Sequence, residues 1–125
     1  LKNAARSVYI KNERKIEVLD EFETLADEVE YVFNIPTQAK VKIVSNSLIE
    51  LSFGNEKVFA KIKSNLPHSA EIFENKITNK KDLPLKGYSF CGFAVKVKPN
   101  TKAKVLVQFY KYKGFFKNLL SEYWY

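Results

Sequence analysis

The chain has 125 residues, enough for one domain with its own core, and 46% of them are hydrophobic, which excludes a wholly disordered chain. No apolar run approaches the roughly 20 residues of a membrane-spanning helix, so we expect no membrane partner. One cysteine and one histidine do not make the usual four-ligand zinc site, and the four glycines form no phosphate loop. We therefore expect neither a metal nor a cofactor.

The net charge of +7 is unevenly distributed along the chain. Residues 1–38 carry five basic and eight acidic side chains, a net charge of −3, whereas residues 39–125 carry sixteen basic and six acidic ones, a net charge of +10. All eight acids of the first part lie in an acidic cluster at residues 13–30. A basic field favours polyanions such as nucleic acid or acidic polysaccharide, although scattered lysines also serve solubility.

Alternation of apolar and polar residues dominates the chain and predicts strands. In chain order they lie around residues 8–10, 16–19, 28–35, 41–43, 49–53, 58–62, 69–75, 90–98 and 102–112. Turn signals occur at Asn12-Glu13, at Gly54-Asn55 and across Pro99-Asn100-Thr101. Pro36 has no amide hydrogen to donate, so we expect the third strand to end there.

The predicted fold class is all-β, an antiparallel β-sandwich of about nine strands. Strands follow one another without intervening helices, which excludes a parallel α/β sheet. A barrel is the alternative, but one-sided alternation favours two faces that close on each other. Residues 1–125 form a single predicted domain, and the opening Leu1 together with the absence of methionine suggests a piece excised from a larger chain. The polar connection at residues 76–87 is expected to protrude.

The C-terminal tail, residues 113–125, is apolar and aromatic. Phe116, Leu119, Leu120 and Tyr123 have helical spacing, which predicts a short terminal helix. The tail is expected to pack against the sandwich. The alternative is an interface for a missing neighbouring domain, because an exposed aromatic segment marks a docking site or an aggregation hazard.

No catalytic site is complete in the sequence, and His68 is the one candidate for proton transfer because it is the only histidine. No nucleophile motif accompanies it. Asp20 shares the parity of Ile16 and Val18, and we expect its carboxylate to accept backbone amide bonds and fix the next turn. The neighbouring acids lack a partner that would separate their pKa values. Cys91 shares the parity of Phe93, Val95 and Val97 in an alternating strand, so its side chain is expected to be buried.

Lysines provide the predicted binding residues. If residues 90–98 and 102–112 form a hairpin, four ammonium groups share its outer face, where like charges repel each other. A polyanion or the acidic cluster would relieve that repulsion, while a solvated sheet edge is the alternative. A fifth lysine lies among aromatic residues 109–112, a weak form of a nucleic-acid stacking platform. The candidates for polyanion binding are Lys96, Lys98, Lys102, Lys104 and Lys111. No zinc-finger, helix-turn-helix or single-strand-binding signature is visible, so nucleic acid is not the expected partner.

Several segments together resemble a known family. Arg6-x-Val8, a short turn and Ile16-Glu17-Val18-Leu19-Asp20 are followed by Val29-Glu30-Tyr31-Val32-Phe33-Asn34-Ile35-Pro36 and by a hairpin around Phe53-Gly54-Asn55. The last two strands, at residues 93–98 and 103–109, complete the pattern. Over about residues 5–110 the chain resembles the C-terminal β-domain of heparinase II/III-like polysaccharide lyases.

The resemblance implies a specific role. Such lyases have an α-helical toroid followed by antiparallel β-sandwich domains, and they cleave uronic-acid polysaccharides, including glycosaminoglycans, by β-elimination. Their Tyr and His catalytic groups lie mainly in the helical domain, and none can be placed on this chain. The resemblance therefore implies a non-catalytic domain that supports the N-terminal helical domain and contacts acidic polysaccharide, in the periplasm or outside the cell.

Two alternatives remain open. The first is a free-standing binding module for acidic glycan or nucleic acid. The second is a small independent enzyme, which the lack of a complete acid–base or metal constellation disfavours.

Overall fold

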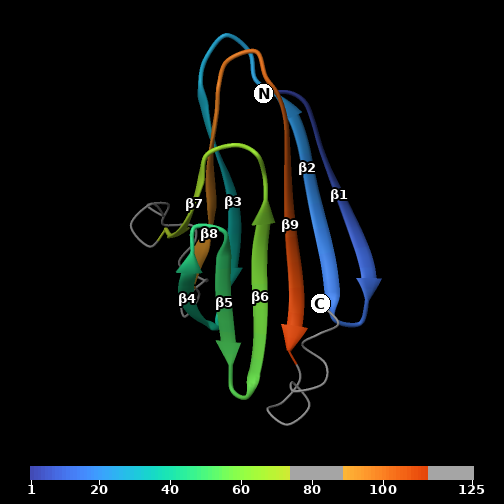
Figure 1. The fold of residues 1–125 in the computed structure, drawn as a ribbon, viewed down its shortest axis with the longest axis vertical. Coiled ribbons are helices and arrows are strands. Elements are labelled where there is room, and N and C mark those ends of the chain that lie inside the picture. Colours follow the sequence, from blue (N-terminus) through green and yellow to red (C-terminus); the bar gives the residue numbers. More distant parts are fainter. Residues whose placement is uncertain (74–88, 113–125) are drawn as a thin grey trace, which may run out of the picture.

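The computed structural model describes residues 1–73 and 89–112. These residues form nine strands in two antiparallel sheets, so the predicted all-β antiparallel sandwich is confirmed (Figure 1). None of them belongs to a helix, and hence no helix that could cross a membrane is found among them. The expected protruding connection at residues 76–87 and the expected terminal helix at residues 113–125 lie outside the described residues.

The two sheets differ in width. The wide sheet has the spatial order β1 (Lys2–Asn12), β2 (Lys15–Glu23), β9 (Lys102–Tyr112), β6 (Glu56–Lys63), β5 (Leu48–Phe53) and β4 (Lys40–Ser45). The narrow sheet has the order β3 (Val29–Thr37), β8 (Ser89–Val97) and β7 (His68–Ile72), and it lies behind the wide sheet in Figure 1.

The core is built mainly from β8 and β9, the strands that lie inside their respective sheets. Their inward residues alternate with outward ones, as the period-2 pattern predicts. Seven inward side chains are at most 2% exposed: Cys91, Phe93, Val95, Val97, Ala103, Val105 and Val107. Strands from both sheets complete the core, with Phe33 of β3 tilted against Phe109 of β9 at 6.2 Å between ring centroids.

The connection between β8 and β9 crosses from one sheet to the other, so the hairpin expected at residues 90–112 is wrong. β8 pairs with β3 and β7, whereas β9 pairs with β2 and β6. Buried Thr24 holds this crossing, since its hydroxyl donates to the Lys98 carbonyl at 2.5 Å and accepts from the Thr101 amide at 2.9 Å. Asn100 has a φ of 53°, a left-handed conformation that asparagine tolerates.

Two strand boundaries differ from the sequence prediction. β3 continues through Pro36 to Thr37, with Pro36 opposite Phe90. β3 is an edge strand, and an edge strand accommodates proline because a missing amide hydrogen can fall on its unpaired side. β2 likewise continues beyond Asp20 to Glu23, so Asp20 does not mark the place where the chain leaves the core.

Gly92 lies at a point where β8 and β3 come very close together. It has a φ of 151°, and a Cβ atom built on it would lie 1.8 Å from the Phe33 carbonyl oxygen. That oxygen belongs to the backbone and cannot move without shifting β3. This position therefore requires glycine for both its conformation and its space.

We expect Gly92→Ala to lower the free energy of unfolding by at least about 1–3 kcal/mol, the cost of a strained backbone conformation. Gly54→Ala is the matched control, because Gly54 also has a positive φ, +61°, but nothing lies within 4 Å of its added Cβ. Urea unfolding followed by circular dichroism measures both variants. Equal losses in the two would show that the close approach to Phe33 has no energetic consequence.

Candidate functional site

The lysines predicted to bind a polyanion do not share one surface. Lys96 alternates with buried Val95 and Val97, so it points outward from the narrow sheet. Lys102 and Lys104 alternate with buried Ala103 and Val105, so they point outward from the wide sheet. Because the sheets pack face to face, the two groups lie on opposite surfaces of the sandwich.

Lys98 lies two residues beyond Lys96, and Lys111 lies at the other end of β9 from Lys102 and Lys104. Lys98 is exposed in the crossing between the sheets, where its carbonyl accepts the Thr24 hydroxyl. Lys111 has the parity of Val107 and Phe109, so it points to the opposite side of β9 from Lys104. Its Nζ lies 3.0 Å from a carboxylate oxygen of Glu56. Of the five predicted lysines, Lys102 and Lys104 thus share the outward face of β9.

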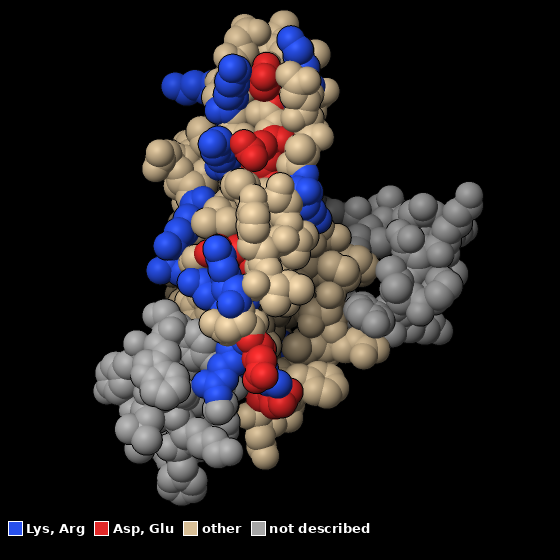
Figure 2. Space-filling model, turned by 90° about the vertical axis from the view of Figure 1, so that its right-hand side faces the viewer, with Lys and Arg blue, Asp and Glu red and all other residues tan. Residues whose placement is uncertain are grey.

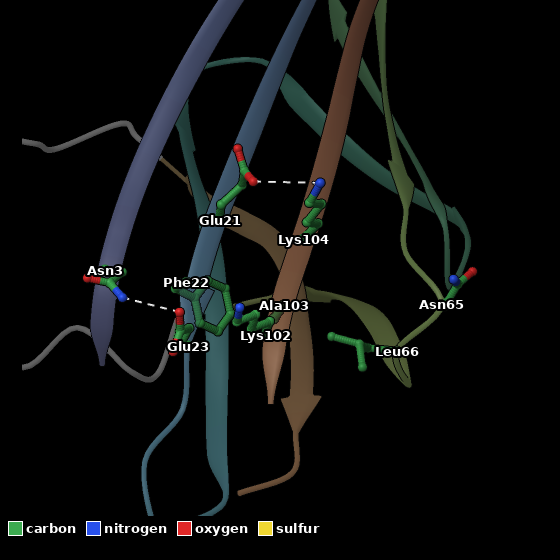
Figure 3. Close-up of a pocket in the computed structure, with 9 residues that line it drawn as sticks. All are labelled: Asn3, Glu21, Phe22, Glu23, Asn65, Leu66, Lys102, Ala103 and Lys104. Atoms are coloured by element: carbon green, nitrogen blue, oxygen red, sulfur yellow. Dashed lines mark hydrogen bonds and ion pairs between the residues drawn. The ribbon is translucent and has the colours of Figure 1, made fainter. Parts of the chain in front are cut away.

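These two lysines line a hollow of about 510 Å³ (Figure 3). β6 ends at Lys63, opposite Leu106, so the first residues of β9 extend beyond it. The chain after β6 turns toward the narrow sheet and leaves an open space beside β9, into which Leu66 reaches. The remaining wall comes from β2 and β1. The full lining is Asn3, Glu21, Phe22, Glu23, Asn65, Leu66, Lys102, Ala103 and Lys104.

The charges of this hollow balance each other. Lys104 Nζ lies 3.7 Å from a Glu21 carboxylate oxygen, and the Asn3 side-chain amide donates to Glu23 at 3.2 Å (Figure 3). No ion pair joins Lys102 to another residue of the described part of the chain. Two ammonium groups and two carboxylates make a mixed polar surface with no net charge. Such a surface suits a ligand with hydroxyl and carboxylate groups better than a dense polyanion.

Other lysines of the wide sheet are also paired locally. Glu17 accepts a hydrogen bond from the Gln108 side chain at 2.5 Å and lies 3.4 Å from Lys11 Nζ. The Gln108 bond, followed by the nearby lysines, lowers the pKa of Glu17 despite the opposing effect of burial. Seen from the β1 side, acidic side chains lie between the basic ones along one margin of the molecule (Figure 2). The acidic cluster of the sequence therefore neutralises part of the basic surface.

The candidate His68 lies at the start of β7, where both ring nitrogens are engaged. Nδ1 lies 2.7 Å from the Leu66 carbonyl oxygen, and Nε2 lies 2.9 Å from the Ser47 hydroxyl. A carbonyl only accepts, so Nδ1 carries the proton and Nε2 accepts from Ser47. This pair resembles a nucleophile with its base, but a carbonyl occupies the third position, where a carboxylate would stabilise an imidazolium. The contacts connect the β4–β5 turn to the start of β7.

Asp20 lies in the interior as its parity predicts, 6% exposed, but its partner differs from the expected backbone amides. The Arg6 guanidinium donates to both carboxylate oxygens, Nε at 2.6 Å and Nη2 at 2.7 Å. This bond raises the pKa of Arg6, and the guanidinium carbon lies 5.0 Å from the centre of the Phe33 ring. Sequence reasoning missed this pair, although Arg6 and Asp20 are equally far from the turn at Glu13 and must therefore face each other in a hairpin.

The described residues offer few further chemical groups. Cys91 is fully buried, as predicted, and desolvation raises its pKa to about 11, so the thiol is protonated at neutral pH. No cluster of three or more metal-ligating side chains occurs within residues 1–73 and 89–112. The Tyr31 hydroxyl is buried without a hydrogen-bond partner in this part of the chain, beside the stacked ring of Phe22.

No family model matches this chain, and no curated protein matches its sequence.

We expect Asp20→Asn to destabilise the fold by about 1.5–3 kcal/mol, the value of hydrogen bonds to charged groups. The matched control is the adjacent Glu21→Gln, whose ion pair with Lys104 is exposed and is expected to cost less than about 1 kcal/mol. Thermal unfolding of both variants measures the difference. A stable Asp20→Asn protein that had lost a measurable activity would contradict a structural role.

We expect Ser47→Ala to lower stability by about 0.5–1.5 kcal/mol, because it removes the donor to His68 Nε2. Ser52→Ala on β5 serves as the control for a serine-to-alanine change. Intact-mass analysis after fluorophosphonate treatment tests reactivity directly, and no adduct is expected. A stoichiometric adduct that Ser47→Ala abolishes would instead identify Ser47 as a nucleophile.

Proposed function

We propose that this chain is a non-catalytic β-sandwich module that contacts a uronic-acid polysaccharide through the hollow beside Lys102 and Lys104. The observation that carries the proposal is the composition of that hollow. Ammonium, carboxylate and amide groups surround an open volume of about 510 Å³, within the size range of ligand sites. Uronic-acid polysaccharides present alternating carboxylates and hydroxyls, which such a surface can pair one by one.

The hydrogen bonds of the interior support a structural role for the domain rather than a catalytic one. Each side chain that the sequence marks for chemistry has a structural partner: Asp20 with Arg6, His68 with Ser47 and Leu66, and Cys91 with the Ile35 carbonyl. The module is accordingly proposed as the C-terminal domain of a heparinase II/III-like polysaccharide lyase, where it supports a catalytic helical domain. An α-helical toroid encoded upstream in the same reading frame would support this placement.

A free-standing binding module remains the alternative, with acidic glycan as its ligand. Nucleic acid is disfavoured by the described aromatic residues. Phe22, the one aromatic residue lining the hollow, is 4% exposed. Phe109 packs against Phe33 in the interior, and Tyr110 stacks on Phe59. Phe22 and Phe109 are therefore covered by the protein and offer no platform for bases, whereas Tyr9 and Phe53 elsewhere on the wide sheet are 46% and 65% exposed.

The experiment is a salt titration of binding to a fluorescently labelled acidic polysaccharide, with single-stranded DNA as competitor. We expect saturable, glycan-selective binding that weakens with salt. The double variant Lys102→Gln/Lys104→Gln is expected to bind about tenfold more weakly, which corresponds to about 1.4 kcal/mol.

The control is Lys40→Gln/Lys42→Gln, which removes the same charge from two exposed lysines of β4. β4 lies three strands from β9, roughly 14 Å away. Equal losses in the two double variants would mean that binding follows net charge alone. Equal affinity for glycan and DNA, or no binding at all, would leave the domain without a carbohydrate site.

A further inference from the structure

One apolar area of the wide sheet is exposed although it lies on the inward face. Val8 and Ile10 of β1 and Ile16 of β2 are 59%, 77% and 41% exposed. We name these three residues the overhang patch. Adjacent exposed aliphatic side chains on one face of a folded domain mark a site that another segment or molecule covers.

The registers place the overhang patch on the core side of the sheet. Ile10 lies opposite Ile16, which lies opposite Phe109 of β9. Val8 lies opposite Val18, which in turn lies opposite the fully buried Val107. Cross-strand neighbours point to the same side, so the patch continues the core surface laterally and toward the β1–β2 turn.

The narrow sheet does not reach far enough to cover this area. Its edge strand β3 lies over β2 and β9, as the contacts of Tyr31 with Phe22 and of Phe33 with Phe109 show. From β1 the long side chain of Arg6 reaches back to Phe33. The wide sheet therefore extends past the narrow one, and β1 forms an overhang with one uncovered face.

The chain itself carries a segment suited to this area. β9 ends at Tyr112, where the Lys111 amide donates to the Arg14 carbonyl in the β1–β2 turn at 2.9 Å. The next residues, 113–125, therefore begin beside the patch. Seven of these thirteen residues are large and apolar or aromatic: Phe115, Phe116, Leu119, Leu120, Tyr123, Trp124 and Tyr125.

The distance from the end of β9 to β1 is short compared with the extended length of residues 113–125. Thirteen residues span up to roughly 43 Å when extended. β1 lies two strands from β9, a distance of roughly 10 Å. The tail can thus reach all three patch residues in a folded or an extended conformation.

We propose that residues 113–125 pack on the overhang patch and complete the inward face of the wide sheet within the same molecule. The occupant has complementary chemistry, because large apolar side chains meet an aliphatic surface. It also starts at the right place, and being part of the same chain it has a high effective concentration at the patch.

The chain supplies its own probe, since Trp124 in the tail is the only tryptophan. In the full-length protein we expect the Trp124 emission maximum to lie at shorter wavelength than that of N-acetyltryptophanamide. Acrylamide quenching is expected to be correspondingly weaker. Both values should stay constant on dilution, because the contact is intramolecular.

Ile10→Lys is expected to shift the Trp124 emission toward that of the free indole and to increase quenching. Val8→Lys serves as a second patch variant in case the first disturbs β1, and the far-ultraviolet circular dichroism of each should remain that of the unchanged protein. Val44→Lys is the matched control, because Val44 is 49% exposed on β4, the opposite edge of the same sheet. It should leave the emission unchanged.

Three results would overturn the proposal. Trp124 emission like that of the free indole in the unchanged protein would mean that the tail is not packed. If Trp124 is protected from quenching and neither patch variant changes its emission, the tail packs elsewhere. Protection that disappears on dilution, with a matching change in sedimentation, would make a second copy of the chain the occupant.

Discussion

Thr24 fixes the crossing between the two sheets, and the arrangement of the domain depends on that crossing. Its hydroxyl binds both ends of the connection at residues 98–101, while its amide donates to the Thr101 carbonyl. β8 and β9 are therefore consecutive in sequence but face each other instead of pairing. Each becomes an interior strand of its own sheet, and their inward valines form the centre of the core. The same crossing sends the lysines that precede it and those that follow it to opposite surfaces.

Unequal sheet width explains where the domain offers surface to other groups. Three strands cannot cover six, so part of the wide sheet remains uncovered even on its inward side. One result is the overhang patch on β1 and the turn end of β2, which continues the inward surface of buried Val18 and Val107 and remains exposed. Next to β9 the short β6 leaves the hollow that contains Lys102 and Lys104. The overhang patch thus arises from the unequal width of the sheets, and the hollow from the early end of β6 within the wide sheet.

Alternation was sufficient to predict nine strands, the antiparallel sandwich, the side of the strand on which Asp20 lies and the burial of Cys91. It could not predict which strands pair, because residues 90–112 alternate in the same way whether the turn closes a hairpin or crosses between sheets. That difference depends on Thr24, seventy-seven residues before Thr101. The strand end predicted at Pro36 was wrong, because the residues around a proline do not show whether their strand lies at the edge or in the interior of a sheet. The hollow was missed for the same reason, since its lining combines β1, β2, β9 and the segment after β6.

The polar groups of the interior show why function is better sought at the surface. Asp20 accepts two hydrogen bonds from Arg6, and both ring nitrogens of His68 have hydrogen-bond partners. Desolvation raises the pKa of the Cys91 thiol to about 11. A catalytic group needs a reacting atom within reach and a pKa near the working pH. Each of these three side chains instead satisfies a neighbour or lies among apolar atoms. In the hollow, by contrast, Lys102 and Lys104 project from the first residues of β9, which extend beyond β6 and pair with β2. The proposed polysaccharide would exchange the exposed Glu21 contact of Lys104 for its own carboxylates.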